Sequence, residues 1–475
     1  MRACRRKQAK QNECLASGSQ SSKVNMAKRF KLQRAEEEEE HPPNTTHFLD
    51  MNDDCIDTIC NLLELDDLCS MSRTCRRIQS VSGDYFQRHY PNNYVRIQSF
   101  RRRSVFYKYP NERYVDDLKP FIRNVIIQEY KGSVCADYLK RNFCENLREL
   151  TLHGINCELN AMHGIQIKDH LEHLENIKFV NCSIGDIYEI FLKHCQRIKH
   201  FGIDEPIQYN GKVTWAQHTF PTLESITYFD EANTNRVEFG PFLRRNAQIK
   251  YIACKGTNVQ ATVMQRAKNL DDLVLCYNTH KDFARNFKLL KHYSENSDTK
   301  RIKLEFTKRL EELDHFAEIT SIQKLHGYRG FLFENLQCAD LFASVEQLKV
   351  LQLPSFGHVS QIYIKRLASC LPNLEELHFT AQDMALSFKN LLTPFCQNRN
   401  LKKIVVYSTH IMYRCKKNDI TELGKVRESI EGVNKLMIYM EKEVIDSMHF
   451  NTFDKNQVIL KPLSELKREI HSFDL

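Results

Sequence analysis

Residues Leu371–Phe379 read LPNLEELHF, in which Leu374, Leu377 and Phe379 follow the pattern L-x-x-L-x-L. The alternation of apolar and polar residues at the end of this pattern is typical of a short strand with one buried face. Copies of such a pattern at a regular spacing indicate a stacked array of similar units. The positions of further copies along the chain therefore decide the fold.

The same pattern fits thirteen places between residues 122 and 438. Ten of the twelve intervals between successive first positions lie between 23 and 29 residues, a regularity that scattered apolar residues do not produce. The pattern positions are Ile122/Val125/Ile127, Leu147/Leu150/Leu152, Leu174/Ile177/Phe179, Ile198/Phe201/Ile203, Leu223/Ile226/Tyr228, Ile249/Ile252/Cys254, Leu270/Leu273/Leu275, Thr299/Ile302/Leu304, Ile322/Leu325/Gly327, Leu348/Leu351/Leu353, Leu374/Leu377/Phe379, Leu401/Ile404/Val406 and Val433/Leu436/Ile438. The members beginning at Thr299 and Ile322 fill the pattern only in part.

Between these strands the apolar residues change to helical spacing. One buried stripe after Phe379 consists of Met384, Phe388, Leu391, Leu392 and Phe395. Strands that alternate with helices in this way stack as a parallel sheet with the helices outside, and no single unit is stable alone. We therefore predict an α/β solenoid of about 12–13 repeats, a horseshoe, over residues 91–440. Residues 441–475 lose the pattern and are predicted to form a C-terminal cap or tail.

Length and composition exclude several classes of protein. A chain of 475 residues exceeds the roughly 250–300 that one hydrophobic core supports, so it holds several domains or a repeat array. The chain contains no run of about 18 apolar residues and no apolar segment behind its basic start, so we expect neither a membrane span nor a secretion signal. The 17 cysteines are then expected to be reduced, and the protein to be cytoplasmic, nuclear or both.

Residues 1–45 form a separate charged segment. They contain almost no large apolar residue and change from the basic Lys28–Lys31 to the acidic run Glu36–Glu40. Such a segment buries too little apolar surface to offset the entropy of ordering it. We predict a disordered charged arm.

Residues 46–90 are predicted to form three short helices. Asn52 and Asp53 are good helix starters. The apolar stripe of the first helix is Ile56, Ile59, Cys60 and Leu63. A second helix is expected from Asp66-Asp67, with the stripe Leu68, Met71, Cys75 and Ile78, and a third short piece over Asp84–Tyr90. Three helices of this size make a poor core alone, so part of their apolar surface is expected to be covered by a partner.

This helical segment resembles an F-box. The resemblance rests on Met51-Asn52 at the opening, on Leu65-Asp66-Asp67-Leu68, and on Cys75-Arg76-Arg77-Ile78 at the end. Asn52 stands where the family has proline, and Ile78 where it has an aromatic residue. The repeats, with Cys157 and Cys182 behind their strands, resemble cysteine-containing leucine-rich repeats.

An F-box followed by leucine-rich repeats resembles the F-box and leucine-rich-repeat protein family. The resemblance implies a substrate-recognition subunit of an SCF-type ubiquitin ligase, with the F-box on a Skp adaptor that is held by a cullin carrying the RING subunit. The repeats then bind a target protein for ubiquitination and proteasomal degradation, and the chain itself supplies orientation and no catalytic group. Eight residues are candidates for contact with the adaptor: Met51, Ile56, Ile59, Leu62, Leu65, Leu68, Met71 and Ile78. About half of them are expected to form the core of the module instead.

The concave sheet face is the expected substrate-binding surface, because solenoids present it to protein partners. Its candidate substrate-binding residues occupy the polar positions of the pattern: Lys178, Thr227, Tyr251, Arg301, Gln352, His378 and Tyr407, together with Thr151, Asp272 and Thr380.

Motifs for catalysis and metal binding are not found. The sequence has no phosphate-binding loop, HExxH or GxSxG. The cysteines at 55, 60, 69 and 75 do not have zinc-ligand spacing, and His163, His170 and His173 are interpreted as surface histidines. The pair Asp271-Asp272 is interpreted as solvated turn and strand-face residues. We expect no catalytic residue, metal or cofactor.

Two other interpretations stay open. One is a leucine-rich-repeat interaction scaffold, independent of ubiquitin ligases, whose helical module binds a partner other than the Skp adaptor. The other is RNA binding, which would need a continuous basic stripe. Because the strand faces mix lysines with acids, we expect no nucleic acid partner; these residues are Lys178, Lys303, Lys403, Asp272, Glu305 and Glu376.

Overall fold

The computed structural model describes a large part of the chain in two units. Residues Met1–Leu63 form the first unit and Glu64–Leu475 the second, and each is described by itself. The described residues are 48–63, 65–89, 95–98, 119–128, 146–155, 161–183, 185–204, 213–229, 239–256, 270–308, 313–331, 336–353, 359–380, 386–407, 415–448, 457–463 and 466. The predicted arm over 1–45, Cys157 and Met384 lie outside them.

The first unit contains a 3-10 helix, η1 (Phe48–Asp50), and the helix α2 (Asp53–Cys60). Asn52 caps α2, because its side-chain Oδ1 accepts a hydrogen bond from the backbone N–H of Cys55 at 2.8 Å. The predicted helix start is thus confirmed. Ile56 and Cys60 from the predicted stripe are fully buried.

The second unit begins with α3 (Leu65–Ser72) and α4 (Arg76–His89), and here the predicted boundaries are wrong. A single helix was expected to run through Cys75 to Ile78, but α3 ends at Ser72 and Ile78 lies in α4. The hydroxyls of Ser72 and Thr74 donate to the carbonyls of Cys69 and Met71, at 2.7 and 2.8 Å, and these bonds close the last turn of α3. The short third piece expected over 84–90 is the end of the longer α4.

A single parallel sheet runs through the second unit, with its strands in chain order from β1 to β15. The strands are β1 (Val95–Gln98), β2 (Asn124–Gln128), β3 (Glu149–His153), β4 (Asn176–Val180), β5 (His200–Asp204), β6 (Ser225–Phe229), β7 (Tyr251–Lys255), β8 (Asp272–Tyr277), β9 (Arg301–Phe306), β10 (Leu325–Arg329), β11 (Val350–Leu353), β12 (Glu376–Thr380), β13 (Lys403–Tyr407), β14 (Leu436–Met440) and β15 (Val458–Pro462). All thirteen members of the sequence pattern coincide with β2 to β14. The strands β1 and β15 extend the sheet at its two ends.

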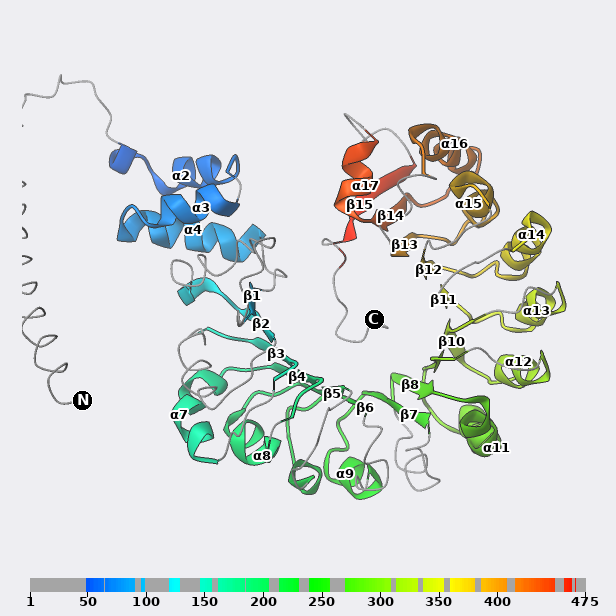
Figure 1. Cartoon of the computed structure of the whole chain (residues 1–475), viewed down its shortest axis with the longest axis horizontal. Coiled ribbons are helices and arrows are strands. Elements are labelled where there is room, and N and C mark those ends of the chain that lie inside the picture. The colour runs from blue at the N-terminus through cyan, green and yellow to red at the C-terminus, as the bar shows by residue number, and fades with distance from the viewer. Residues whose placement is uncertain are drawn as a thin grey trace, which may run out of the picture. The chain divides into compact units, whose positions relative to one another are not determined.

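Helical segments connect the strands, and Figure 1 shows α11 to α16 on one side of the sheet. The helical segments are η2 (Lys119–Phe121), α7 (Ala161–Leu171), α8 (Ile187–Ile190), η3 (Leu192–His194), η4 (Thr214–Gln217), α9 (Phe239–Arg245), α11 (His280–Asn296), α12 (Leu313–Thr320), α13 (Leu336–Leu341), η6 (Phe342–Ser344), α14 (Gln361–Cys370), α15 (Phe388–Cys396), α16 (Lys417–Glu428) and α17 (Lys442–Ser447). The architecture is therefore mixed α/β: short N-terminal helices come first in the chain, and a long parallel sheet with connecting helices follows them.

Two rows of buried apolar side chains run across the strands in register. Leu150 of β3 pairs with Ile177 of β4, and Leu152 pairs with Phe179. These residues are the second and third positions of the pattern, and each is at most 2% exposed. Because successive strand residues point to opposite faces, the residues between them lie on the face away from the helices.

The register changes at β10, where one extra residue is inserted. Leu325 pairs with Ile302, but Gly327 pairs with Lys303, so His326 forms a bulge. The pattern placed Gly327 in the core, and this is wrong. Tyr328, which is 0% exposed, fills that position, since the bulge moves every later residue of β10 by one place.

Trp215 in η4 is the centre of an aromatic core. It is 0% exposed, and its ring meets Phe201 and Phe242 edge to face, with centroids 5.1 and 5.3 Å apart. Tyr228 lies 5.7 Å away in a tilted arrangement. Such pairs add to the free energy that burial of the rings already supplies. Two successive repeats are therefore joined around one indole ring.

Phe242→Ala should destabilise this core, because it leaves a cavity beside the indole ring. We expect the free energy of unfolding to fall by about 3–5 kcal/mol. A urea titration followed by the fluorescence of Trp215, the one tryptophan of the chain, measures it. The control is Ile362→Ala on α14, where the side chain is 69% exposed and the change should stay within about 0.5 kcal/mol. Equal midpoints for the two variants would contradict this account of the core.

His326→Gln should make stability less dependent on pH. Burial, followed by Lys303 and Arg301, lowers the pKa of His326 from 6.5 to about 4. Between these two pH values His326 is protonated in the unfolded chain and neutral in the folded chain. The wild type therefore loses stability as the pH falls from 6.5 toward 4. The difference in urea midpoint between variant and wild type should grow in the variant's favour over this range. A difference that is constant with pH would show that His326 does not titrate in this way.

Candidate protein-interaction surfaces

The residues predicted to contact an adaptor differ widely in exposure. Ile56, Leu68 and Ile78 are each 0% exposed, which favours a role in the core of the helical segment. Met51, Ile59 and Met71 are half-buried, and the side chain of Leu65 lies outside the described residues. Among the seven whose side chains are described, Leu62 alone is strongly exposed, at 81%.

Exposed apolar side chains gather in the first unit. Besides Leu62, which follows the end of α2, Phe48 in η1 is 41% exposed. Leu62, the more exposed of the two, is the large apolar residue of the first unit most open to a protein partner among those that the structure describes. Leu62 is among the adaptor contacts predicted from the sequence, and Phe48 is not. The position of Phe48, just before the first helix, is the one feature of the sequence that could have indicated its exposure.

The predicted substrate-binding residues fall into three groups on the sheet face away from the helices. Lys178 and Thr227 both pair with Gly202, from the strands on its two sides. Tyr251 and Arg301 flank Asp272 in the same way. The third group contains Gln352, His378 and Tyr407, where Gln352 pairs with His378.

The second group joins an apolar patch to a charged pair. Tyr251, Ala253 and Val274 form a buried cluster with Phe229 packed against it. Arg301 donates to Oδ2 of Asp272 at 2.5 Å, while Oδ1 of Asp272 has no hydrogen-bond partner within the described part of the chain. Tyr251, predicted to bind substrate, is thus only 6% exposed, and Arg301 is the more accessible member of this group.

The third group is a hydrogen-bonded network. His378 bridges Oε2 of Glu376 at 3.1 Å and the hydroxyl of Tyr407 at 3.3 Å. Lys403 adds an ion pair to Glu376 at 2.6 Å. Burial would raise the pKa of Glu376, but the bonds from His378 and Lys403 outweigh it and lower the pKa to about 2. Beside this network, Oε1 of Gln352 is buried and lacks a donor among the described residues.

Ion pairs also cross the face elsewhere. Lys178 lies 3.4 Å from Asp204, and Arg329 pairs with Glu305. Burial raises the pKa of Glu305, against the effect of Arg329. The face is therefore a mixture of paired charges, which suits a protein partner better than a uniform polyanion.

A further charged feature lies at the edge where the strands begin. We name it the edge row: the residues immediately before β3 to β13. It consists of Arg148, Glu175, Lys199, Glu224, Lys250, Asp271, Lys300, Lys324, Lys349, Glu375 and Lys402. From Arg148 to Lys300 the sign of charge alternates at every strand. Sequence reasoning missed this row, although it follows once the position before each strand is aligned.

Ion pairs join neighbouring members of the edge row. Glu175 lies between Arg148 and Lys199, at 3.6 and 2.7 Å. Glu375 lies between Lys349 and Lys402, at 2.5 and 2.7 Å. The hydrogen bond from Lys199 lowers the pKa of Glu175, and the bond from Lys349 lowers that of Glu375. Opposite charges on neighbouring strands favour the observed register.

The described residues contain neither a membrane-spanning helix nor a cluster of metal ligands. None of their helices is both long and apolar enough to cross a bilayer. No group of three or more His, Cys, Asp or Glu residues there has the arrangement of a metal site. Asp271, interpreted as a solvated turn residue, is paired instead with Lys300 at 2.6 Å.

Comparison with known proteins gives one result that bears on the helical segment. A search of curated proteins found no match to the chain. The family model for the F-box domain matches residues 48–86, a range that includes η1, α2, α3 and most of α4. Domains of this family generally bind the Skp adaptor in SCF complexes, and F-box proteins are generally non-catalytic substrate receptors. Residues 48–86 are thus an F-box domain, which suggests the role of an SCF-type substrate adaptor.

Proposed function

We propose that this chain is the substrate-recognition subunit of an SCF-type ubiquitin ligase. The F-box domain would dock on the Skp adaptor, which is bound in turn by a cullin and its RING subunit, and the parallel sheet would hold the target protein for ubiquitination and degradation. The observation that carries the proposal is the F-box match over residues 48–86, followed by a long repeated strand–helix array in the same chain.

The array is proposed to consist of leucine-rich repeats. The strands recur at the spacing of the L-x-x-L-x-L pattern, and their apolar positions stack in register. The thiol of Cys182, after β4, donates to the carbonyl of Leu152 on β3 at 3.1 Å. A cysteine that bonds the preceding repeat explains why this residue type follows a strand. Burial raises the pKa of Cys182 to about 11, so it stays a neutral donor.

Such a subunit accelerates ubiquitin transfer by holding two proteins close together, and it needs no reacting group of its own. The sheet face supports this role, because it carries paired charges on several strands. Both the cytoplasm and the nucleus contain ligases of this class, and we propose either or both as its location.

Leu62 offers the sharpest test of adaptor binding. At 81% exposure it makes little contribution to the core, so Leu62→Asp should leave the fold intact while placing a charge on the docking surface. We expect capture of the Skp adaptor and cullin by the full-length protein to fall by at least about tenfold, as for loss of an apolar interface anchor. Co-purification from cells measures it.

Ile362→Asp is the matched control, because Ile362 is also a strongly exposed aliphatic residue but lies on α14 of the solenoid. It should leave adaptor capture unchanged, and both variants should keep the unfolding transition reported by Trp215. If the wild type captures no Skp adaptor, the ligase role is wrong and the chain is an interaction scaffold with another partner.

A further inference from the structure

The edge row departs from its alternation at one place. Lys300, Lys324 and Lys349 precede the neighbouring strands β9, β10 and β11, so three cations follow one another without an acid between them. Elsewhere from Arg148 to Asp271 the chain avoids this arrangement. The bulge in β10 sets the register of these lysines: Leu325 pairs with Ile302 and Gly327 with Val350, so Lys324 lies opposite Arg301, and His326 lies opposite Lys349.

The counter-charges of these lysines lie to the two sides and not between them. Lys300 pairs with Asp271 on the β8 side, at 2.6 Å. Lys349 pairs with Glu375 on the β12 side, at 2.5 Å. Lys324 donates to the backbone carbonyl of Ser297, which carries no net charge. The middle strand of the three thus has an excess of positive charge.

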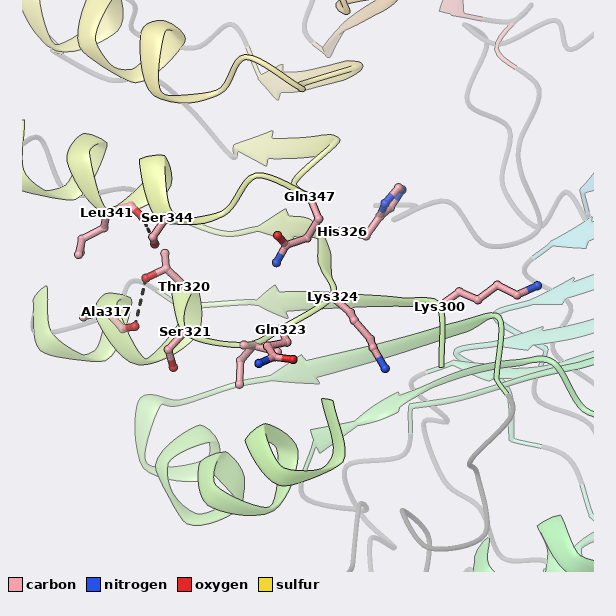
Figure 2. Close-up of a pocket in the computed structure, with 11 residues that line it drawn as sticks. Lys300, Ala317, Thr320, Ser321, Gln323, Lys324, His326, Leu341, Ser344 and Gln347 are labelled. Carbon is pink, nitrogen blue, oxygen red and sulfur yellow. Dashed lines mark hydrogen bonds between the residues drawn. The ribbon is translucent and has the colours of Figure 1, made fainter. Parts of the chain in front are cut away.

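A pocket of about 750 Å³ opens at this place. It is lined by Lys300, Lys324 and His326 at the strand side, and by Thr320, Ser321 and Ser344 at the helix side (Figure 2). Its described lining, which also includes Gln323 and Gln347, contains neither Asp nor Glu. The pocket coincides with the β10 bulge, since His326 is the inserted residue.

The backbone also holds Lys324 in an unusual conformation. Its φ is +64°, a left-handed value that a non-glycine residue seldom adopts. Such conformations persist where the surrounding structure imposes them, and they are concentrated at functional sites. The carbonyl of Lys324 accepts the N–H of Ile302 at 2.9 Å, which fixes this residue at the pocket.

The electrostatic surroundings favour an anion. Burial lowers the pKa of His326, and Lys303, Arg301 and Lys349 lower it further, against Asp272. The helix ends nearby would repel an anion through their free carbonyls. Here Thr320 and Ser344 donate their hydroxyls to the carbonyls of Ala317 and Leu341, at 3.1 and 2.7 Å, and thereby cap them (Figure 2).

We propose that this pocket binds an acidic side chain, Asp or Glu, of the target protein, which supplies a carboxylate to the two lysines of its lining, Lys300 and Lys324. This inference rests on the proposed role as a substrate receptor, because the acid is assigned to the target. It extends the target-binding surface from the sheet face to the edge where β9 to β11 begin.

Peptide binding to the full-length protein tests the pocket. Three pools of fluorescein-labelled decapeptides are compared, each with uncharged random flanks around three central residues, which are Glu, Gln or phosphoserine. Binding is measured by fluorescence anisotropy at about 50 mM salt, so that salt screens the charges only weakly. The Glu pool should bind more tightly than the Gln pool. Lys324→Gln should weaken binding of the Glu pool about tenfold, as for loss of one charge-assisted hydrogen bond.

Lys250→Gln is the matched control, with the same charge change in the same row. Lys250 lies between Glu224 and Asp271 in the alternating part, so this variant should bind the Glu pool as the wild type does. Lys324→Glu places a carboxylate in the lining of the pocket and should abolish binding. All variants should retain the Trp215 unfolding transition.

Three results would overturn the proposal: equal binding of the Glu and Gln pools, equal losses in Lys324→Gln and Lys250→Gln, or phosphoserine binding at least tenfold tighter than Glu, which would assign a phosphate site instead. Leu62→Asp should bind the Glu pool normally. If the wild type captures no adaptor but binds the Glu pool, the ligase role is wrong and the pocket proposal stands. Failure of the proposed function is therefore distinguishable from failure of the pocket proposal.

Discussion

The structure depends on the pairing of each parallel strand with the next one in register. A strand of five residues cannot stand alone in water, and each repeat buries its apolar face only against its neighbours. The rows that contain Leu150–Ile177 and Leu152–Phe179 satisfy this requirement, because the same face of every strand meets the same face of the next. A slip of one residue would turn the apolar side chains to the opposite face. Everything else in the second unit is arranged around these rows.

Much of this arrangement is predictable from the sequence, because the stacking requirement places apolar residues at a local and regular spacing. Thirteen strands follow from that spacing. The terminal strand β15 does not, since Val458 and Leu460 stack on one side only and lack the leading apolar residue of the pattern. The boundary between α3 and α4 also escapes prediction, because Ser72 and Thr74 end the helix through hydroxyl bonds that leave the apolar spacing unbroken.

The bulge at β10 shows why a tertiary requirement can override a local pattern. Leu325 and Gly327 fit the template by position, yet a glycine side chain cannot fill the core between Leu304 and Leu351. Insertion of His326 brings Tyr328 there instead, where its ring meets Phe316 edge to face with centroids 5.5 Å apart. The exposure of single residues is equally hard to predict: Ile56 and Leu62 are both expected to contact an adaptor, but the first is fully buried and the second is 81% exposed.

The edge row and the bulge are connected through the same strand. Where the register is regular, alternating charges stabilise the pairing of neighbouring strands, and acids such as Glu175 and Glu375 serve two lysines each. At β10 the inserted His326 lies opposite Lys349, and Lys324, the residue before the strand, donates a hydrogen bond to the backbone carbonyl of Ser297. The large aromatic core around Tyr328 can hold the strand without help from edge charges. An unbalanced positive charge is therefore tolerable at this one strand, and the pocket beside it, whose described lining contains no acid, is suited to the carboxylate that we propose a target supplies.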